Sequence, residues 1–294
     1  MKKSVAVIYG GYSSEYEISK KSANTVYSNI DRTLFNPYLV GVTKEGWTVE
    51  IDRERIPINR NNFTYTLKGK EVAFDCAFIM IHGTPGEDGK LQSYFDMLGI
   101  KYPTSNALAS AITFNKWTCN SILLQNGYKC AESIILRNKE EYSLQKIESK
   151  IKMPCFVKPN NGGSSFGISK VKVTDELNDA IQLAFNEGSE VLIEEFIEGV
   201  EVTCGVINVN NKEIKALPPT EIVTENEFFD YEAKYKGESE EITPARISKK
   251  LTIEIQKQSK DIFELLNLKG MARVDFMIKN DVPYVIEVTT IPGL

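Results

Sequence analysis

The most constraining feature of this sequence is a glycine- and serine-rich segment, residues 160–167 (NNGGSSFG), between two short apolar stretches. Residues 154–158 and 168–173 are typical of β-strands, so the pattern predicts a strand pair joined by a flexible flap. Lys158 ends the first strand, and with the backbone N–H groups and hydroxyls of the small residues it suits a phosphate. The spacing is not that of a Walker A loop, which disfavours a P-loop NTPase. A polar hairpin loop without a ligand is the alternative.

Composition limits the classes of protein to which this chain can belong. With 294 residues, 42% of them hydrophobic and 26% charged, the chain can form two or three globular domains. The net charge is -5 and lysines are spread along the chain, so we expect no nucleic-acid partner. The apolar run in the N-terminal MKKSVAVIYGG is too short for a signal sequence or a membrane span. We therefore expect a cytoplasmic protein with no membrane association.

Cysteine and histidine leave little room for thiol or imidazole chemistry. The five cysteines are scattered and never form a CxxC pair, so we interpret them as reduced packing residues. His82 is the one histidine, so a histidine-rich metal site or a Ser-His-Asp enzyme would depend on it alone.

The first hundred residues predict an α/β domain. A strand rich in Val and Ile at 4–9 ends in two glycines and is followed by a helix at about 15–30. Further buried strands are expected at 38–43 and 72–81, with a helix at 90–98. This alternation predicts an open parallel sheet, whose ligands would collect at the carboxyl ends of its strands.

The rest of the chain predicts a mixture of helices and strands. Helices are expected at 105–126 and 175–187, and extended segments at 128–136, 191–197, 201–209, 271–278 and 283–289.

Two acidic residues lie on the last two predicted strands. Only residues 279–283 connect these strands, so an antiparallel hairpin would bring Asp275 and Glu287 together. Acids in apolar strands are costly unless they are paired or bind a metal, and magnesium binds through one or two carboxylates plus substrate phosphates. Arg273 would share the face of Asp275 and suits a phosphate or a developing negative charge. An ordinary buried salt bridge between Arg273 and one of the acids is the alternative.

A lysine-bearing glycine flap upstream of a two-acid hairpin is the order of parts in the ATP-grasp enzymes. From Val5 to Gly293 the chain closely resembles the D-alanine:D-alanine ligase family of that group. The matching segments are VIYGGYSSEYEIS, IHGTPGEDGKLQ, YPTSNALASAITFNKW, FVKPNNGGSSFGISKV, VLIEEFIEGVEVT, FFDYEAKY, RVDF and EVTTIPG. The resemblance implies an α/β N-terminal substrate domain with an open parallel sheet (1–104), followed by a two-lobed ATP-grasp fold of α+β type. The central lobe with the flap would span 105–193, and the C-terminal lobe with the magnesium site 194–294.

The resemblance also implies an ATP site. Lys116, Lys158 and Lys234 would contact phosphates, and Glu201 would hold the ribose hydroxyls. Glu194 and the backbone of Phe196 and Ile197 would read the adenine at the hinge between the lobes. The adenine would be sandwiched by Phe156, Phe196, Met277 and Ile286, and the further ATP contacts expected are Ser165 and Glu195.

The family's catalytic and substrate residues also have matches in this sequence. Glu15 would bind the ammonium group of the first D-alanine, in a hydrogen-bonded set with Ser164 and Tyr235. Arg273 and the backbone N–H of Gly293 would stabilise the oxyanion of the tetrahedral intermediate. His82 and Glu87 would line the substrate side, and Asp275, Glu287 and Thr289 would hold two magnesium ions, for which manganese could substitute.

The activity implied by the resemblance is ATP-dependent ligation of two D-alanine molecules for peptidoglycan precursor synthesis. The carboxylate of the first would attack the terminal phosphate of ATP, and the amine of the second would displace phosphate from the acyl phosphate. Tyr235 favours an amine over D-lactate as the second nucleophile. Members of the family commonly form homodimers, which the resemblance therefore allows here.

Three features depart from the family pattern. Thr289 stands where the family has the asparagine of E-x-N-T, which predicts weaker magnesium binding, and Asn115 stands where an aspartate is common. The chain ends at Leu294, whereas family members continue with a segment that holds the second D-alanine, so we expect that pocket to be incomplete. Two alternatives therefore stay open: a degenerate ATP-grasp module that binds nucleotide with little turnover, and a ligase that makes D-alanyl-D-serine or D-alanyl-D-lactate.

Overall fold

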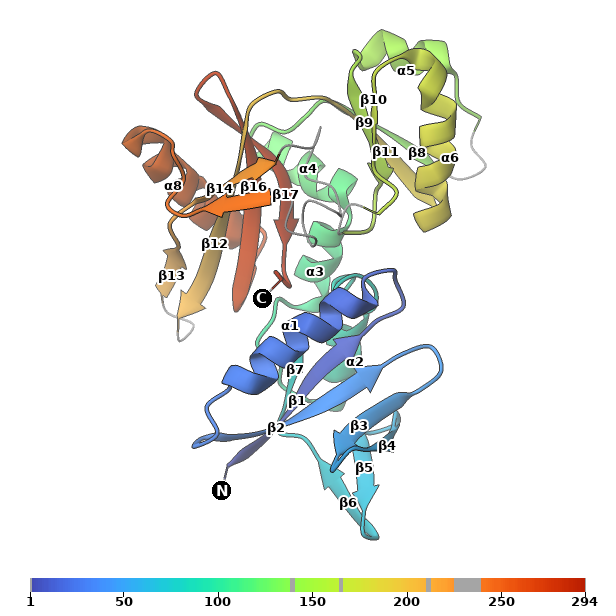
Figure 1. Cartoon of the computed structure of the whole chain (residues 1–294), viewed down its shortest axis with the longest axis vertical. Coiled ribbons are helices and arrows are strands. Elements are labelled where there is room, and N and C mark those ends of the chain that lie inside the picture. Colours follow the sequence, from blue (N-terminus) through green and yellow to red (C-terminus); the bar gives the residue numbers. More distant parts are fainter. Residues whose placement is uncertain (1, 138–140, 164–165, 210–212, 225–238, 294) are drawn as a thin grey trace. The chain divides into compact units, whose positions relative to one another are not determined.

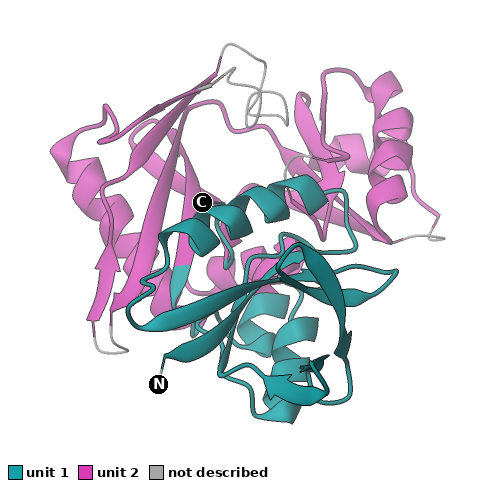
Figure 2. Cartoon of the chain, turned by 60° about the horizontal axis from the view of Figure 1, so that its bottom comes forward, with its two compact units in different colours: residues 1–111, 267–271, 290–294 teal, residues 112–266, 272–289 magenta. Residues whose placement is uncertain are grey.

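The computed structural model describes residues 2–137, 141–163, 166–209, 213–224 and 239–293 of the chain (Figure 1). The chain forms two compact units, which Figure 2 colours separately. Unit 1 contains residues 1–111, 267–271 and 290–294, and unit 2 contains residues 112–266 and 272–289. Each unit has a hydrophobic core of its own.

Unit 1 is built on a seven-stranded sheet in the order β6-β5-β4-β3-β2-β1-β7. Strand β1 (Lys3–Gly10) pairs in parallel with β2 (Phe35–Val42) and with β7 (Cys76–Ile79). An antiparallel run extends the sheet through β3 (Trp47–Ile51), β4 (Glu54–Asn59), β5 (Thr64–Leu67) and β6 (Lys70–Ala73). Helices α1 (Tyr16–Asn29) and α2 (Lys90–Leu98) belong to the same unit.

The predicted α/β fold class is confirmed, but the sheet of unit 1 is mixed rather than parallel throughout. Residues 5–8 are buried, as expected for a strand with parallel neighbours on both sides. The β3–β4 hairpin of this run was not predicted because its two-residue turn at Asp52-Arg53 has φ angles of 50° and 72° without a glycine to signal them, and the glycine of the Lys68-Gly69 turn between β5 and β6 was not interpreted as a hairpin signal. The predicted strand 72–81 is also wrong in part, because the chain leaves the ladder at Phe74 and Asp75, between β6 and β7.

Helix α1 packs against β1 and β2 (Figure 1). It also binds the carboxyl ends of the parallel strands through hydrogen bonds of Ser19. Its buried face recurs at helical spacing and consists of Ile18, Ser19, Ser22 and Ala23. Ser19 Oγ accepts a hydrogen bond from Gly10 N (2.9 Å) and donates one to Met80 O (2.8 Å). One buried serine therefore satisfies backbone groups at the end of β1 and just after β7.

Unit 2 contains two sheets. The first has the order β10-β9-β11-β8, and the second has the order β15-β14-β12-β16-β17 with β13 paired to β12. The strands are β8 (Ser133–Arg137), β9 (Cys155–Pro159), β10 (Ser169–Val171), β11 (Glu190–Glu195), β12 (Val200–Val209), β13 (Glu213–Ala216), β14 (Thr220–Thr224), β15 (Ser239–Ile242), β16 (Met271–Lys279) and β17 (Val282–Thr289). The helices are α3 (Ala107–Phe114), which begins in unit 1, α4 (Lys116–Gln125), α5 (Leu144–Lys150), η1 (Thr174–Glu176), α6 (Leu177–Glu187) and α8 (Lys249–Leu265). Helix α6 packs on the first sheet and α8 on strands β12 and β13.

The two strand pairs predicted from the sequence are confirmed. Strands β9 and β10 pair in antiparallel fashion on either side of the glycine segment. Strands β16 and β17 form a hairpin in which Asp275 faces Glu287. The predicted helix 105–126 is divided at Asn115, whose side chain caps α4 by accepting a hydrogen bond from Thr118 N (2.9 Å).

The segments on either side of the β16–β17 hairpin belong to unit 1. The fully buried Ser105 accepts a hydrogen bond from Lys269 N through its Oγ (3.1 Å). Gly270 has a φ of 70°, and a Cβ there would lie 1.9 Å from Pro103 O, so only glycine fits. After β17, Ile291 is buried in the core of unit 1. The strands that carry Arg273, Asp275 and Glu287 therefore start and finish at packed positions.

The cysteines are packing residues, as predicted. All five are free thiols, and four of them are buried. Burial raises the pKa of the Cys119 and Cys130 thiols to about 12, so both stay protonated near neutral pH. In the stretches of chain given above, no helix combines the length and the hydropathy that crossing a membrane requires.

Candidate active site

A buried ion pair links strands β9 and β11. Lys158 Nζ lies 2.5 Å from Glu194 Oε2, and the two side chains are 8% and 6% exposed. Lys158 faces Leu192 in the ladder, so Glu194 is its diagonal neighbour on the same face of the sheet. Asn120 Nδ2 on α4 also donates to Glu194 Oε1 (3.3 Å). Each charge of the pair thus has a partner, without which its burial would cost several kcal/mol.

A second contact between a lysine and a carboxylate joins α4 to the hairpin. Lys116 Nζ lies 2.8 Å from Glu287 Oε1 and also donates to Gly162 O (2.5 Å) in the glycine segment. Lys116 is buried. The lysine predicted to bind phosphate therefore contacts both the acid predicted to bind magnesium and the backbone of the flap.

The hairpin presents its polar residues on one face. Arg273 forms a bidentate pair with Asp275 (2.7 and 2.8 Å), so the salt bridge predicted as an alternative is present beside the facing acids. The register shifts between Asp275 and Phe276, which leaves Ile286 as the extra residue of a β-bulge. Ile286 and Glu287 are consecutive, yet both are half-buried. The bulge therefore lets a predicted adenine contact and a predicted metal ligand share one side of β17.

The oxygen donors of the hairpin suit magnesium. Asp275 and Glu287 supply two facing carboxylates, and Thr289, opposite Arg273, supplies a hydroxyl. Magnesium usually binds through one or two carboxylates plus substrate phosphates rather than in an all-protein cage. Among the described residues, no group of three or more His, Cys, Asp or Glu side chains could hold a metal by itself. The hairpin thus fits an ion that also binds a phosphate.

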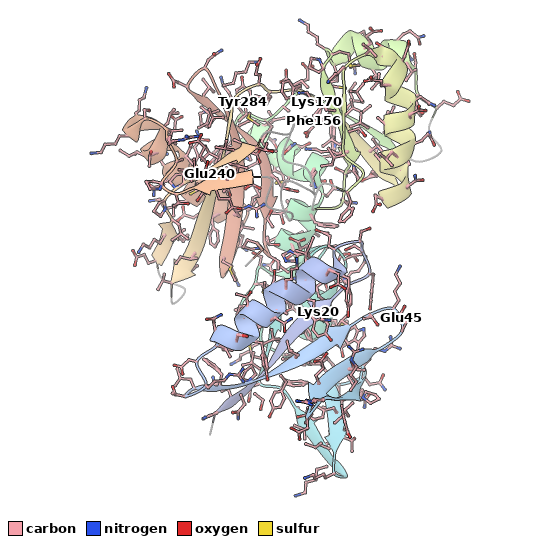
Figure 3. All side chains as sticks on the ribbon, in the orientation of Figure 1. Lys20, Glu45, Phe156, Lys170, Glu240 and Tyr284 are labelled. Atoms are coloured by element: carbon pink, nitrogen blue, oxygen red, sulfur yellow. The ribbon has the colours of Figure 1, made fainter. Side chains whose placement is uncertain are left out.

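Two phenylalanine rings form an apolar surface beside the buried ion pair, and the ammonium group of a lysine lies over one of them. The rings of Phe156 and Phe196 lie 5.8 Å apart at 58°, and Lys170 Nζ lies 4.0 Å from the centroid of the Phe196 ring. Phe156 and Lys170, labelled in Figure 3, face each other in the β9–β10 ladder. Both rings are half-buried, so their faces suit a planar heterocycle.

Unit 1 holds the acids predicted to bind the amino-acid substrate. A Cβ on Gly83 would lie 2.5 Å from Ser13 Oγ and 2.7 Å from Glu15 Oε2, so both side chains lie against the backbone of Gly83. Glu87 Oε2 accepts a hydrogen bond from Gly83 N (2.8 Å). Glu15 and Glu87 are buried. The structure therefore brings the two acids to one glycine, just after the parallel strand β7.

His82 lies next to this glycine and is also buried. Its Nε2 is 3.0 Å from Ser22 Oγ on α1. The predicted substrate residues Glu15, His82 and Glu87 thus form one cluster with the start of α1, at the carboxyl end of the parallel strands.

The other predicted site residues have different surroundings. Ser164, Ser165, Lys234 and Tyr235 lie outside the described residues. Glu195 follows Glu194 and so points to the other face of β11, where its Oε1 accepts a hydrogen bond from Glu132 N (3.1 Å). Glu201 faces Ile222 in the β12–β14 pair, and Met277 faces Tyr284 in the β16–β17 hairpin. Ile197 is buried. Gly293 is exposed and belongs to unit 1.

Sequence reasoning missed three side chains that contact the predicted site. Asn120 lies four residues after Lys116 on α4, so helical spacing places the two on one face. Lys170 lies on the predicted strand that follows the flap. Ser22, which contacts His82, lies on the predicted helix at 15–30.

The two halves of the chain match two family models. The model described as "D-ala D-ala ligase N-terminus" matches residues 4–105, and that described as "D-ala D-ala ligase C-terminus" matches residues 123–294. A D-alanine--D-alanine ligase from Flavobacterium johnsoniae is 49% identical over 99% of this chain and 90% of its own length. Another from Azobacteroides pseudotrichonymphae is 50% identical over 99% of this chain and 91% of its own length.

Solved structures agree with these matches. D-alanyl-alanine synthetase A from Vibrio cholerae has a TM-score of 0.88 at 28% identity, over 99% of this chain and 90% of its own. The VanG D-Ala:D-Ser ligase from Enterococcus faecalis has a TM-score of 0.87 at 33% identity, over 100% and 91%. A Bacillus anthracis D-alanine--D-alanine ligase complexed with ATP has a TM-score of 0.77 at 30% identity, over 99% and 87%.

Proposed function

This chain belongs to the D-alanine--D-alanine ligase family of ATP-grasp enzymes, and from that membership we propose how its own residues act. It is an ATP-dependent ligase that joins two D-alanine molecules for peptidoglycan synthesis. The observation that carries the proposal for the residues is the 2.8 Å contact between Lys116 and Glu287. This contact joins a lysine suited to phosphate with an acid suited to magnesium.

ATP binds to unit 2 through charged and apolar contacts. Lys116 and Lys158 bind its phosphates, and the carboxylate partner of each lysine holds the Nζ atom in position. The rings of Phe156 and Phe196 stack on the adenine, with Ile286 of the bulge and Met277 as further apolar contacts. Glu194 and the backbone at 196–197 read the adenine edge, and Glu201 holds the ribose.

Magnesium is the proposed cofactor, with Asp275, Glu287 and Thr289 as its protein ligands. When bound, it neutralises charge on the phosphates and orients them for transfer. Arg273 fixes the carboxylate of Asp275 with two hydrogen bonds. Its positive charge also stabilises the oxyanion that forms during ligation, together with the backbone N–H of Gly293.

The first D-alanine binds to unit 1. Its ammonium group pairs with the buried carboxylate of Glu15, which lies against Gly83. Glu87 holds the backbone N–H of Gly83, and His82 is oriented by Ser22. These contacts fix the position of the substrate before any bond forms, which is the main contribution that such an enzyme makes.

The reaction then proceeds in two steps. A carboxylate oxygen of the first D-alanine attacks the terminal phosphorus of ATP, which forms an acyl phosphate and releases ADP. The amine of the second D-alanine attacks the acyl carbon, a C–N bond forms, the C–O bond to phosphate breaks, and the nitrogen loses one proton as the amide forms. Ser164, Lys234 and Tyr235 are the further residues that we propose for closing the site over the acyl phosphate.

Family membership also supports the organisation predicted from the sequence. We propose the domains 1–104, 105–193 and 194–294, of which the first boundary lies close to the end of the first family model at residue 105. A homodimer and a cytoplasmic location are proposed on the same ground.

D-serine is the second candidate for the second substrate. One of the similar solved structures is a D-Ala:D-Ser ligase, 33% identical to this chain. The two candidates differ only in which amino acid accepts the D-alanyl group, so a product assay separates them.

We expect Glu15→Gln to lower kcat/KM for D-alanine by at least about 100-fold, because it removes the charge that pairs with the substrate ammonium. Affinity for MgADP, measured by calorimetry, should stay unchanged. Glu17→Gln, an exposed change two residues along the chain in the first turn of α1, is the matched control and should behave as the wild type. Equal activity of the Glu15 variant and the wild type would contradict the role of Glu15.

We expect Gly83→Ala to lower kcat/KM for D-alanine by roughly 10- to 100-fold, because the new Cβ displaces the side chains of Ser13 and Glu15. Gly99→Ala is the control, since Gly99 has a similar φ (68° against 72°) but no atom within 4 Å of a Cβ. Steady-state kinetics with both variants therefore separates backbone strain from the clash. If the two variants lose activity equally, strain alone explains the effect and the proposed contact is wrong.

A further inference from the structure

The first turn of α4 is held in place by Asn160, which directly follows strand β9. Lys116 N donates to Asn160 O (3.1 Å), and Trp117 N donates to Asn160 Oδ1 (2.8 Å). The next N–H group, that of Thr118, donates to Asn115 Oδ1 (2.9 Å). The N–H groups at the start of a helix have no partners within the helix. Asn160 therefore satisfies two of them, including that of the phosphate-binding lysine itself.

Asn160 is in turn fixed to strand β11. Its backbone N donates to Glu190 O (2.9 Å), and its Nδ2 donates to Glu190 Oε2 (2.7 Å). Asn160 is 0% exposed, so each of these polar groups would be costly to leave unpaired. Glu190 also accepts hydrogen bonds from Asn115 Nδ2 (3.3 Å) and from Arg137 Nε (3.2 Å).

We propose that Asn160 is a positioning residue for Lys116 in ATP binding. Asn160 directly follows β9, which carries Lys158, and it holds the backbone from which the Lys116 side chain extends. The same residue thus sets the spacing between the two lysines that bind phosphate. This inference rests on the proposed role of Lys116.

An amide is required at position 160 because the side chain must do two things at once. Its oxygen accepts from the N–H of Trp117, and its nitrogen donates to the carboxylate of Glu190. An aspartate at position 160 keeps the oxygen that accepts from Trp117 N, but its second carboxylate oxygen would repel the carboxylate of Glu190. A glutamine at position 190 would restore a donor and acceptor pair with the polarity reversed.

The experiment is a double-mutant cycle with Asn160→Asp, Glu190→Gln and the combined variant, using MgADP as the probe. Calorimetry measures the Kd for MgADP, and urea unfolding measures stability in parallel. Lys116→Gln is the reference for loss of the phosphate contact. Arg137→Gln, which removes the exposed partner of the same carboxylate, is the matched control.

We expect Asn160→Asp to raise the Kd for MgADP by about tenfold or more, and Glu190→Gln to raise it less. The combined variant should return the Kd to within about threefold of the wild type, and Arg137→Gln should leave it unchanged. If Asn160→Asp does not fold, the same test compares the Kd for MgADP of Glu190→Gln with that of the combined variant, which should be closer to the wild type.

Three results would overturn the proposal. Single variants that unfold at lower urea but bind MgADP with unchanged Kd would show that Asn160 only supports the fold. An unchanged Kd for Lys116→Gln would remove the phosphate role of Lys116, and the role of Asn160 with it. If only Lys116→Gln weakens binding, the proposed function stands and the role of Asn160 fails.

Discussion

Replacing Lys158 with methionine should lower the free energy of unfolding by about 3 to 5 kcal/mol and abolish measurable ligation, because it leaves Glu194 buried without a counter-charge. Lys158 and Glu194 are 8% and 6% exposed and lie 2.5 Å apart. Asn120 alone, at 3.3 Å from Glu194, cannot neutralise the carboxylate. Urea unfolding and a phosphate-release assay measure the two effects separately.

A matched variant separates the structural role of this pair from its role in binding. Lys158→Met combined with Glu194→Gln removes both charges and keeps an acceptor for Asn120 Nδ2. We expect it to recover most of the lost stability, since a buried pair can be replaced by neutral groups at little cost. ATP binding should stay lost, because the phosphate contact is absent. Unchanged unfolding of the Lys158→Met variant would contradict the burial argument.

Replacing Glu287 with glutamine should lower kcat by at least about 100-fold at low magnesium, and excess magnesium should restore part of the activity. The reason is that Glu287 is both a proposed magnesium ligand and the partner of Lys116 at 2.8 Å. Changes in the groups around metal ligands already cost 10- to 100-fold, and loss of a ligand is expected to cost at least as much. A magnesium titration of the rate measures the effect.

Thr289→Asn is the matched variant, and it should strengthen magnesium binding where Glu287→Gln weakens it. Thr289 is the other residue of β17 proposed to bind the ion, and an amide oxygen is a stronger magnesium ligand than a hydroxyl. We expect this variant to reach half-maximal rate at a lower magnesium concentration than the wild type. If neither variant changes the magnesium dependence, the hairpin is not the metal site.

The parts of the fold that were predicted correctly carry local signals. The hairpin at 271–289 has two alternating strands and a short connection, so the pairing of its strands follows from the pattern, whereas the bulge at Ile286 that sets Asp275 opposite Glu287 required the structure. The antiparallel run at 47–73 was missed because its β3–β4 turn has no glycine and places Arg53, a residue that rarely adopts a positive φ, at φ 72°, and because the glycine of the Lys68-Gly69 turn was not interpreted as a hairpin signal. The division of unit 1 into a parallel and an antiparallel part therefore required the structure.

The sequence predicted individual residues of the site better than the contacts between them. Asp275 and Glu287 were expected to lie close together in a hairpin, and they pair directly across it. Lys158 and Glu194 were predicted as separate contacts to phosphate and adenine, and their pairing depends on the β9–β11 register, which no local pattern specifies. Asn160 lies within the most informative motif, yet its two-sided hydrogen bonding depends on α4 and β11, which are distant in the sequence.

The most direct test is phosphate release from MgATP with D-alanine, L-alanine or no amino acid, with the dipeptide product identified by mass spectrometry. We expect release that requires D-alanine and yields one D-alanyl-D-alanine for each phosphate. Parallel reactions with D-alanine plus D-serine or D-lactate identify the second nucleophile. Release that does not depend on D-alanine, or no release while MgADP still binds, would contradict the assignment of this chain as a working D-alanine ligase.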